Sequence, residues 1–332
     1  MVNWVLQKRS KRLLIFVLIM AIVPVFPAIW LNEKIFSPPR RDIHKYHLTR
    51  LNHPAKYGLS IRKFDCLKSK VQCLLVEPNN LAGPGKRGKI LRRQVTKKGI
   101  NLAVYGKIRG IVVLLHGRNG RKEDLLPIAE RFVAAGFRCL IPDLPAHGSS
   151  PISAMSFGSS RFEASLPRQI LNSARAQFNL PKEPAALWGI SMGGAFAIQA
   201  ASESQDMWDA LLVVSSFSSL NKILDRQVPN KWKLAKPIVF FYLDIAQWLR
   251  GRPRLSNINP QAWAKSIKIP TLIVHGESDN FIPTSQGKEI YNAINTKKKR
   301  WLTVPKGRHS NVLATAMPLY AEMNSWLIGV LE

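Results

Sequence analysis

The stretch that decides the fold lies between residues 185 and 201. It opens with the apolar run Ala185-Ala186-Leu187-Trp188, passes through Gly189-Ile190-Ser191-Met192-Gly193, and continues into Ala195-Phe196-Ala197-Ile198-Gln199-Ala200-Ala201. Gly-x-Ser-x-Gly between a strand and a helix is typical of a nucleophile elbow, a turn so tight that it needs glycine on either side of the serine. The turn lifts the serine hydroxyl above the strand end and aims the helix N-terminus at the reacting centre. We therefore predict Ser191 as a nucleophile.

A serine hydroxyl is a poor nucleophile at neutral pH, so it needs a base, and the base needs an orienting acid. Asp279 and His309 each follow a short apolar, strand-like run, and they come after Ser191 in the order Ser, Asp, His. That order is the one expected for this kind of sheet, and loops past strand ends are where open α/β sheets place their sites. We predict His309 as the base and Asp279 as the acid, with Glu277 as the alternative acid.

An oxyanion hole requires two backbone N–H donors. Met192, at the predicted helix N-terminus, supplies one of them. The loop His116-Gly117-Arg118-Asn119-Gly120, which follows the apolar run 111–115, is predicted to supply the other from the Arg118 amide. Only the backbone of Arg118 is needed; its side chain either points into solvent or contacts an anionic group of the substrate. His116, His147 and His275 lie on earlier loops and are expected to be structural.

Apolar strand-like runs alternate with helical spacing over most of the chain, which predicts a mostly parallel sheet covered by helices on both faces. An antiparallel hairpin is predicted over 59–77, and a flexible basic loop over 78–100. The predicted strands cover residues 111–115, 137–141, 185–188, 210–214, 270–275 and 301–304, and the predicted helices cover 123–135, 166–178, 284–294 and 317–330.

Residues 216–265 are predicted to form a short insert between the strands 210–214 and 270–275. The insert is rich in apolar and aromatic side chains that are mixed with lysines. Within it, residues 231–249 fit an amphipathic helix with an apolar face toward an acyl chain or a bilayer and a basic face toward lipid headgroups. A helix that simply packs on the core fits the same residues equally well.

The N-terminus carries a predicted membrane anchor. Residues 13–31 form an uncharged apolar run that is long enough to cross a bilayer core, and they follow a basic flank at residues 1–12. The run is longer than a signal-peptide core and ends in no Ala-x-Ala-like site, which favours an uncleaved anchor over a cleaved signal. We expect a single-pass protein whose enzyme domain is extracytoplasmic, although basic residues also follow the run. Residues 32–58 are predicted to be a basic linker, and residues 59–332 the folded domain.

The net charge of +29 is concentrated near the N-terminus, because residues 1–110 carry 23 Lys and Arg residues against 4 Asp and Glu residues. No nucleic-acid recognition motif accompanies this charge, so an anionic membrane surface is the expected partner. The three histidines between residues 44 and 53 match no strong metal-ligand pattern. Cys66 and Cys73 face each other across the predicted hairpin, where a disulfide and two free thiols fit equally well.

These motifs together resemble the α/β-hydrolase superfamily, and within it the group of monoacylglycerol lipases, lysophospholipases and serine aminopeptidases. The resemblance covers about residues 59–330 and rests on His116-Gly117, Asp143-Leu144-Pro145-Ala146-His147-Gly148, the elbow at Ser191, Gly276-Glu277-Ser278-Asp279 and His309. Ala146 departs from the glycine that is usual at its position. The family inserts its lid between the strands that correspond to 210–214 and 270–275, so the resemblance implies that residues 216–265 are a short lid or cap.

The resemblance implies hydrolysis of an ester, thioester or amide through an acyl-enzyme, without a cofactor. The expected function is that of a membrane-anchored serine hydrolase whose substrate is a lipid or lysolipid acyl ester. An anchored peptidase or thioesterase is the alternative among enzymes. A non-catalytic, hydrolase-like binding protein is the alternative from another class.

Overall fold

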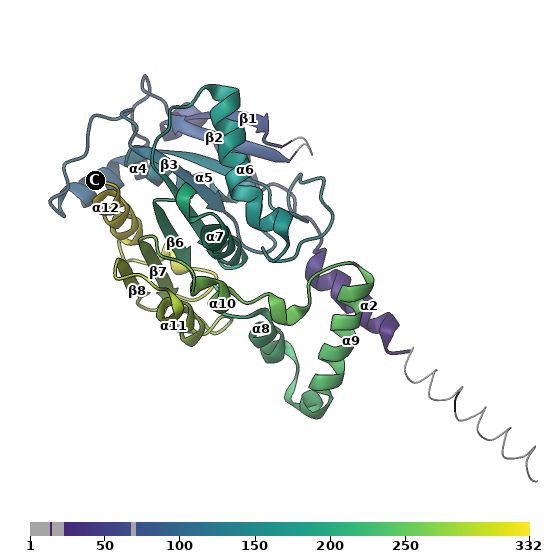
Figure 1. Cartoon of the computed structure of the whole chain (residues 1–332). Helices are drawn as coiled ribbons and strands as arrows, with labels where there is room; N and C mark the ends of the chain where they lie inside the picture. Colours follow the sequence, from purple (N-terminus) through teal and green to yellow (C-terminus); the bar gives the residue numbers. More distant parts are fainter. Residues whose placement is uncertain (1–13, 15–22, 68–70) are drawn as a thin grey trace, which may run out of the picture.

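The computed structural model describes residues 14, 23–67 and 71–332, and its centre is one eight-stranded sheet (Figure 1). The strand order is β1-β2-β4-β3-β5-β6-β7-β8; β2 pairs antiparallel with β1 and β4, and all other neighbours are parallel. The strands are β1 (Leu59–Asp65), β2 (Gln72–Pro78), β3 (Gly110–Leu115), β4 (Phe137–Pro142), β5 (Ala185–Ile190), β6 (Ala210–Val214), β7 (Thr271–Gly276) and β8 (Lys299–Val304).

The central strands are buried on both faces, which explains why they read as continuous apolar runs. In β3, Ile111 and Val113 point into one core, whereas Val112 and Leu114 point into the other. The first core is covered by α6 (Arg161–Phe178), α7 (Met192–Glu203), α10 (Pro260–Ala264) and α11 (Thr284–Ala293), and the second by α4 (Lys86–Thr96), α5 (Leu126–Ala134) and α12 (Leu319–Leu331). The predicted α/β class with helices on both faces is confirmed.

The β1–β2 hairpin has the predicted place, and Cys66 and Cys73, at the end where the chain turns, form a disulfide with a Cα–Cα distance of 5.7 Å. The sequence fits a disulfide and two free thiols equally well, and the structure contains the disulfide. Cys139 in β4 is a buried free thiol, and burial raises the pKa of that thiol.

Residues 86–96, which lie in the stretch predicted to be a flexible basic loop, form α4 instead. Leu91 and Val95 are fully buried on one side of this helix, and Gly88 lies against Ala134 of α5. Residues four apart share a helix face, so these two apolar side chains anchor the helix while its many basic side chains remain outside. Because most residues of this segment are polar or basic, the narrow apolar stripe of Leu91 and Val95 did not indicate a helix in the sequence.

The segment predicted to be a basic linker is also folded onto the domain. It contains the end of α2 (Val25–Phe36), α3 (Lys45–Asn52) and the short 3₁₀ helix η1 (Pro54–Tyr57). Phe36 is completely buried, and the buried Arg50 guanidinium lies 3.9 Å and 4.4 Å from the ring centres of Tyr46 and Tyr57. Cation–π stacking of this kind stabilises a buried basic residue. The basic composition of the segment alone does not predict such burial.

Nine of the 19 residues of the predicted membrane anchor, namely residues 13 and 15–22, lie outside the described residues; residues 25–31 belong to α2. Within the part of the chain that the structure describes, no helix combines the length and the apolar character that crossing a bilayer requires.

The segment predicted to be the cap contains α8 (Leu220–Gln227) and α9 (Lys236–Leu249), and α2 lies beside α9 at this end of the molecule (Figure 1). The predicted helix 231–249 begins later, because residues 230–235 form a 3₁₀ turn and Pro237 occupies the first turn of α9. The short 3₁₀ segments are η2 (Lys122–Leu125), η3 (Gln205–Met207), η4 (Asn230–Ala235), η5 (Leu255–Asn257) and η6 (Val312–Ala314).

Candidate active site

Ser191 occupies the sharp turn between β5 and α7. Its backbone has φ 54° and ψ −118°, a conformation that is strained for a residue with a side chain. The Ser191 N–H donates to the carbonyl of Val214 at the end of β6, which fixes the turn to the neighbouring strand at 2.9 Å. Strain of this kind persists only where the surroundings impose it, and it gathers at functional sites.

Glycine is required on both sides of Ser191 because backbone atoms pass close by. A Cβ at Gly189 would lie 2.1 Å from the carbonyl oxygen of Gly193, and a Cβ at Gly193 would lie 2.1 Å from the carbonyl oxygen of Leu115. Both distances are far below van der Waals contact, and the obstructing atoms are backbone. The Gly-x-Ser-x-Gly pattern is therefore a packing requirement of this turn.

The structure brings the three predicted side chains of the triad together. His309 Nε2 lies 3.0 Å from Ser191 Oγ, and His309 Nδ1 lies 2.8 Å from Asp279 Oδ2. Asp279 is buried, and its Oδ1 accepts hydrogen bonds from the N–H groups of Phe281 and Ile282. A fixed carboxylate facing Nδ1 favours the imidazole tautomer that carries its proton there, so Nε2 is free to accept the serine proton.

Glu277, the alternative acid, lies apart from this triad. It is exposed, and its carboxylate accepts a hydrogen bond from the backbone N–H of Lys306. The geometry thus places Asp279, and not Glu277, against the imidazole of His309.

Arg118 and Met192, the predicted oxyanion donors, line the same cavity as Ser191. Met192 is the first residue of α7, where a backbone N–H has no partner within the helix and is available to a ligand. The side chain of Arg118 is exposed, and its Nη2 donates to the carbonyl of Lys34 in α2 at 2.7 Å. The amide of Arg118 is the candidate donor.

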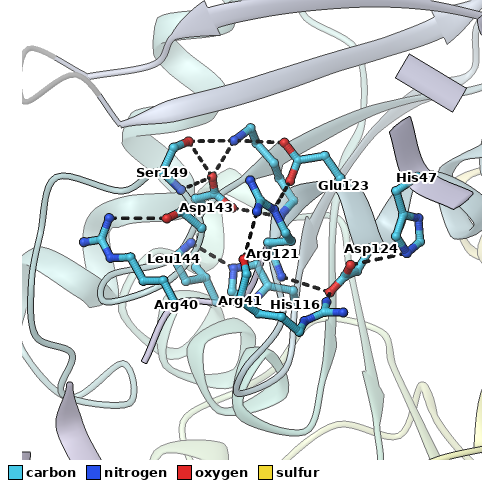
Figure 2. A network of polar contacts seen from close by, with 12 residues as sticks. Arg40, Arg41, His47, His116, Arg121, Glu123, Asp124, Asp143, Leu144 and Ser149 are labelled. Atoms are coloured by element: carbon cyan, nitrogen blue, oxygen red, sulfur yellow. Dashed lines mark hydrogen bonds and ion pairs between the residues drawn. The ribbon is translucent and has the colours of Figure 1, made fainter. Parts of the chain in front are cut away.

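A polar network holds the loop that carries Arg118 (Figure 2). At its centre the Lys122 ammonium pairs with the buried carboxylate of Asp143, which also accepts hydrogen bonds from the N–H groups of Lys122 and Ser149. Burial alone would raise the pKa of Asp143, but the positive charge of Lys122 and the hydrogen bonds that the carboxylate accepts together outweigh burial and lower that pKa. Asp143 therefore stays ionised and fixes the loop through several hydrogen bonds.

The N-terminal segment contributes to the same network. Arg41, just past α2, pairs with Asp124 and donates to the carbonyl of Asn119 at 3.2 Å, while Arg121 donates to the carbonyl of Arg41 at 2.9 Å (Figure 2). His47 of α3 lies 3.3 Å from the other oxygen of Asp124. These contacts cannot be predicted from the sequence, because nothing in the spacing of the basic residues indicates which acidic residue each will meet.

Two buried histidines complete the support of this loop. His147 Nε2 accepts the N–H of Asn119 while its Nδ1 lies 2.8 Å from the carbonyl of Pro145, and His116 Nε2 accepts the N–H of Leu144. An imidazole that accepts at Nε2 must be neutral. Burial, reinforced by the neighbouring His116, lowers the pKa of His147 to about 3. The structural role predicted for these histidines fits this arrangement.

The low pKa of His147 predicts a loss of stability in acid. The unfolded chain binds a proton on this side chain below its ordinary pKa of 6.5, but the folded chain does so only near 3, so stability is full above pH 6.5 and falls as pH drops toward 3. At pH 4 the cost is roughly 3 kcal/mol. Urea unfolding between pH 7 and pH 4 measures it. His147→Gln, which keeps an acceptor but does not titrate, is expected to show a shallower pH slope; equal slopes would contradict the assignment.

A cavity of about 550 Å³ opens beside Ser191 and is almost entirely apolar. Its walls come from α2, from α8 and α9 of the cap, and from the loops that hold Phe157, Phe217 and Phe281. Phe281 also lies against His309, with ring centres 5.0 Å apart. The polar lining residues are Arg118, Ser191 and Gln227, so the described lining contains no acidic side chain.

Comparison with known proteins identifies a family for the centre of the chain. Residues 106–259 match a family described as "Serine aminopeptidase, S33". Protein bem46 of Schizosaccharomyces pombe is 24% identical over 213 residues, which are 61% of this chain and 62% of that protein, so less than two thirds of bem46 is matched.

Solved structures extend the comparison of the fold. An esterase of Pyrococcus furiosus has a TM-score of 0.58 at 17% identity and covers 89% of this chain and 96% of its own. A membrane phospholipase A, described as a bacterial virulence factor, has a TM-score of 0.52 at 13% identity and covers 98% and 99%. These structures show that the chain has the α/β-hydrolase fold, and its central residues, slightly less than half of the chain, match the serine aminopeptidase S33 family.

Proposed function

We propose that this protein is a serine hydrolase that cleaves an acyl ester, of the lipid or lysolipid kind, through an acyl-enzyme intermediate. The observation that carries the proposal is the contact of 3.0 Å between His309 Nε2 and Ser191 Oγ at the base of an apolar cavity. A hydroxyl that faces a correctly oriented imidazole is the arrangement that activates serine as a nucleophile.

In the proposed reaction, Ser191 Oγ attacks the ester carbonyl carbon while His309 Nε2 takes the hydroxyl proton. The N–H groups of Met192 and Arg118 stabilise the negative charge that develops on the carbonyl oxygen. His309 then gives its proton to the departing alcohol, and an acyl ester remains on Ser191. Water, activated by the same imidazole, releases the acid and restores the serine. Asp279 holds the ring and stabilises the imidazolium.

The lining of the cavity favours an acyl ester over the free N-terminus of a peptide. An aminopeptidase must bind the positively charged amine at the end of its substrate, which requires an acidic partner when water is excluded. No acidic residue lines the described cavity, whereas aromatic and aliphatic side chains dominate it. Such a surface suits a hydrocarbon chain, so the alternative of an anchored peptidase is disfavoured despite the family's description.

The membrane part of the proposal rests on charge and on exposed apolar surface. Besides the uncharged run 13–31, α9 carries one exposed apolar stripe, Ile238, Phe241 and Trp248, next to the exposed lysines 231 and 233. Basic groups beside an apolar stripe suit the surface of an anionic bilayer. The Cys66–Cys73 disulfide favours an oxidising, extracytoplasmic compartment for the domain.

A substrate panel tests the proposed chemistry. The purified full-length chain is incubated with monoacylglycerols, lysophospholipids, acyl thioesters and aminoacyl amides, and released product is measured. Turnover of the acyl esters is expected to exceed that of the amides. Turnover of the peptide analogues alone would refute the proposal, and no turnover of any substrate by a folded chain would favour a binding protein.

Two measurements test the membrane assignment. The full-length chain is expected to remain in the membrane pellet after an alkaline carbonate wash. In intact cells, a membrane-impermeant maleimide is expected to label Cys66 and Cys73 only after an external reductant has opened their disulfide. Labelling that requires lysis would place the domain on the cytoplasmic side.

A further inference from the structure

Helix α2 forms part of the wall of the cavity that contains Ser191. Leu31 and Ile35 both line this cavity, and α2 lies next to α9. The two residues are four apart and therefore share one face of the helix. This helix precedes the hydrolase domain that the sequence predicted, so its presence at the site is unexpected.

The other two faces of α2 have different surroundings. Ala28, Asn32 and Phe36 are buried, whereas Phe26 and Trp30 are exposed, with 70% and 64% of their surface accessible. Successive residues of a helix turn by about 100°, so these positions form one packed side, one cavity side and one outward side. The apolar character of the cavity side is not needed to bury the helix, because the packed side already does so.

The position of α2 is fixed by contacts with both the cap and the oxyanion loop. Arg252 Nη1 donates to Asn32 Oδ1 at 2.9 Å, and the ring of Phe36 packs edge-on against Phe157 with centres 5.4 Å apart. Near its C-terminal end the carbonyl of Lys34 accepts the Arg118 guanidinium. A wall held from several directions presents Leu31 and Ile35 to the cavity at a constant depth, as a selective pocket requires.

We propose that α2 determines the acyl-chain length that the cavity accepts, through the side chains of Leu31 and Ile35. The inference rests on the proposed hydrolase function and adds a specificity determinant to it. Cavities of about 300–1,000 Å³ hold ligands of moderate size, so the cavity of about 550 Å³ leaves room for a chain of several carbons beside the serine. A larger side chain on this wall shortens the space without touching the triad.

Ile35→Trp tests the proposal with p-nitrophenyl esters of increasing chain length. In the full-length variant, kcat/KM for dodecanoate and hexadecanoate is expected to fall about tenfold or more, because a pocket discriminates by that order for each misfitted methylene. The value for acetate and butyrate is expected to change less than threefold. Phe26→Trp, an enlargement on the outward face of the same helix, is the matched control and is expected to leave the chain-length profile unchanged.

The outcomes separate this inference from the proposed function. Equal loss on all chain lengths, or an unchanged profile in Ile35→Trp, would overturn the role of α2. If that variant does not fold, Ile35→Ala carries the test, and its profile is expected to move toward longer chains; no movement would also overturn the inference. Labelling of Ser191 by a fluorophosphonate probe is expected in all these variants. Its absence from the wild-type chain would instead indicate that the proposed hydrolase function fails.

Discussion

Ser191→Ala is expected to abolish both ester hydrolysis and covalent labelling by a fluorophosphonate probe. Without Oγ no acyl-enzyme forms, and His309 has no hydroxyl proton to accept. Loss of the nucleophile from a serine–histidine–aspartate triad lowers kcat by about 10⁶-fold, so the residual rate is expected to be indistinguishable from background. The measurement is gel fluorescence after probe treatment, together with the initial rate on the best ester of the panel.

A matched serine variant controls for nonspecific effects. Ser285 is an exposed residue of α11 outside the cavity, and Ser285→Ala is expected to keep wild-type labelling and rates. The folding of both variants is checked by circular dichroism and thermal melting. Labelling that persists in folded Ser191→Ala would mean that another residue is the nucleophile, and the proposed site would be wrong.

The sheet could be predicted because its local and tertiary signals agree. β3, β5 and β6 must be apolar on both faces, so their burial is visible as short uninterrupted runs, and each observed strand lies within two residues of its prediction. The elbow could be predicted equally well. The backbone of Leu115 passes so close to Gly193 that only glycine fits there, and this requirement is visible in the sequence. A strand buried on both faces and a tight turn each restrict which residue types can occupy their positions, so both can be recognised in the sequence.

The N-terminal third was harder to predict because its structure depends on distant partners. α4 and α3 have basic compositions, and each is held by a few buried groups, such as Leu91 in α4 and Arg50 in α3. The burial of Arg50 depends on Tyr57 stacking on its guanidinium and on Glu130 lying 3.8 Å away, on α5. A partner far along the chain leaves no local pattern, so tertiary packing overrode the linker and loop predictions.

In the active site, too, some residues can be predicted from the sequence and others cannot. The triad follows the chain order of its strands, and each side chain stands just past a strand end, so sequence position alone indicated Ser191, Asp279 and His309. No comparable rule of sequence position identifies the residues that line the cavity. Leu31 ends the run that was predicted to be a membrane anchor, and Ile35 lies in the predicted basic linker. Only tertiary contacts of α2, such as those with α9, bring both residues to the cavity of the serine.

Asp279→Asn is expected to lower kcat by about 10⁴-fold while leaving KM nearly unchanged. In the wild type, Oδ1 accepts the N–H groups of Phe281 and Ile282, and Oδ2 faces His309 Nδ1. The asparagine oxygen must stay with the two N–H donors, which turns its NH₂ group toward Nδ1. Nδ1 then has to accept, so the ring proton moves to Nε2, the atom that should receive the serine proton.

Glu277→Gln is the matched control, because Glu277 is the neighbouring carboxylate and is exposed. We expect its kcat to lie within about twofold of the wild type, since neutralising a solvated group far from the imidazole changes little. Initial rates on a saturating ester, and the rate of fluorophosphonate labelling, measure both variants. A large loss in Glu277→Gln with a small one in Asp279→Asn would reverse the assignment of the acid. Comparable small losses would show that His309 keeps its tautomer without a carboxylate, and that the contact with Asp279 serves the fold alone.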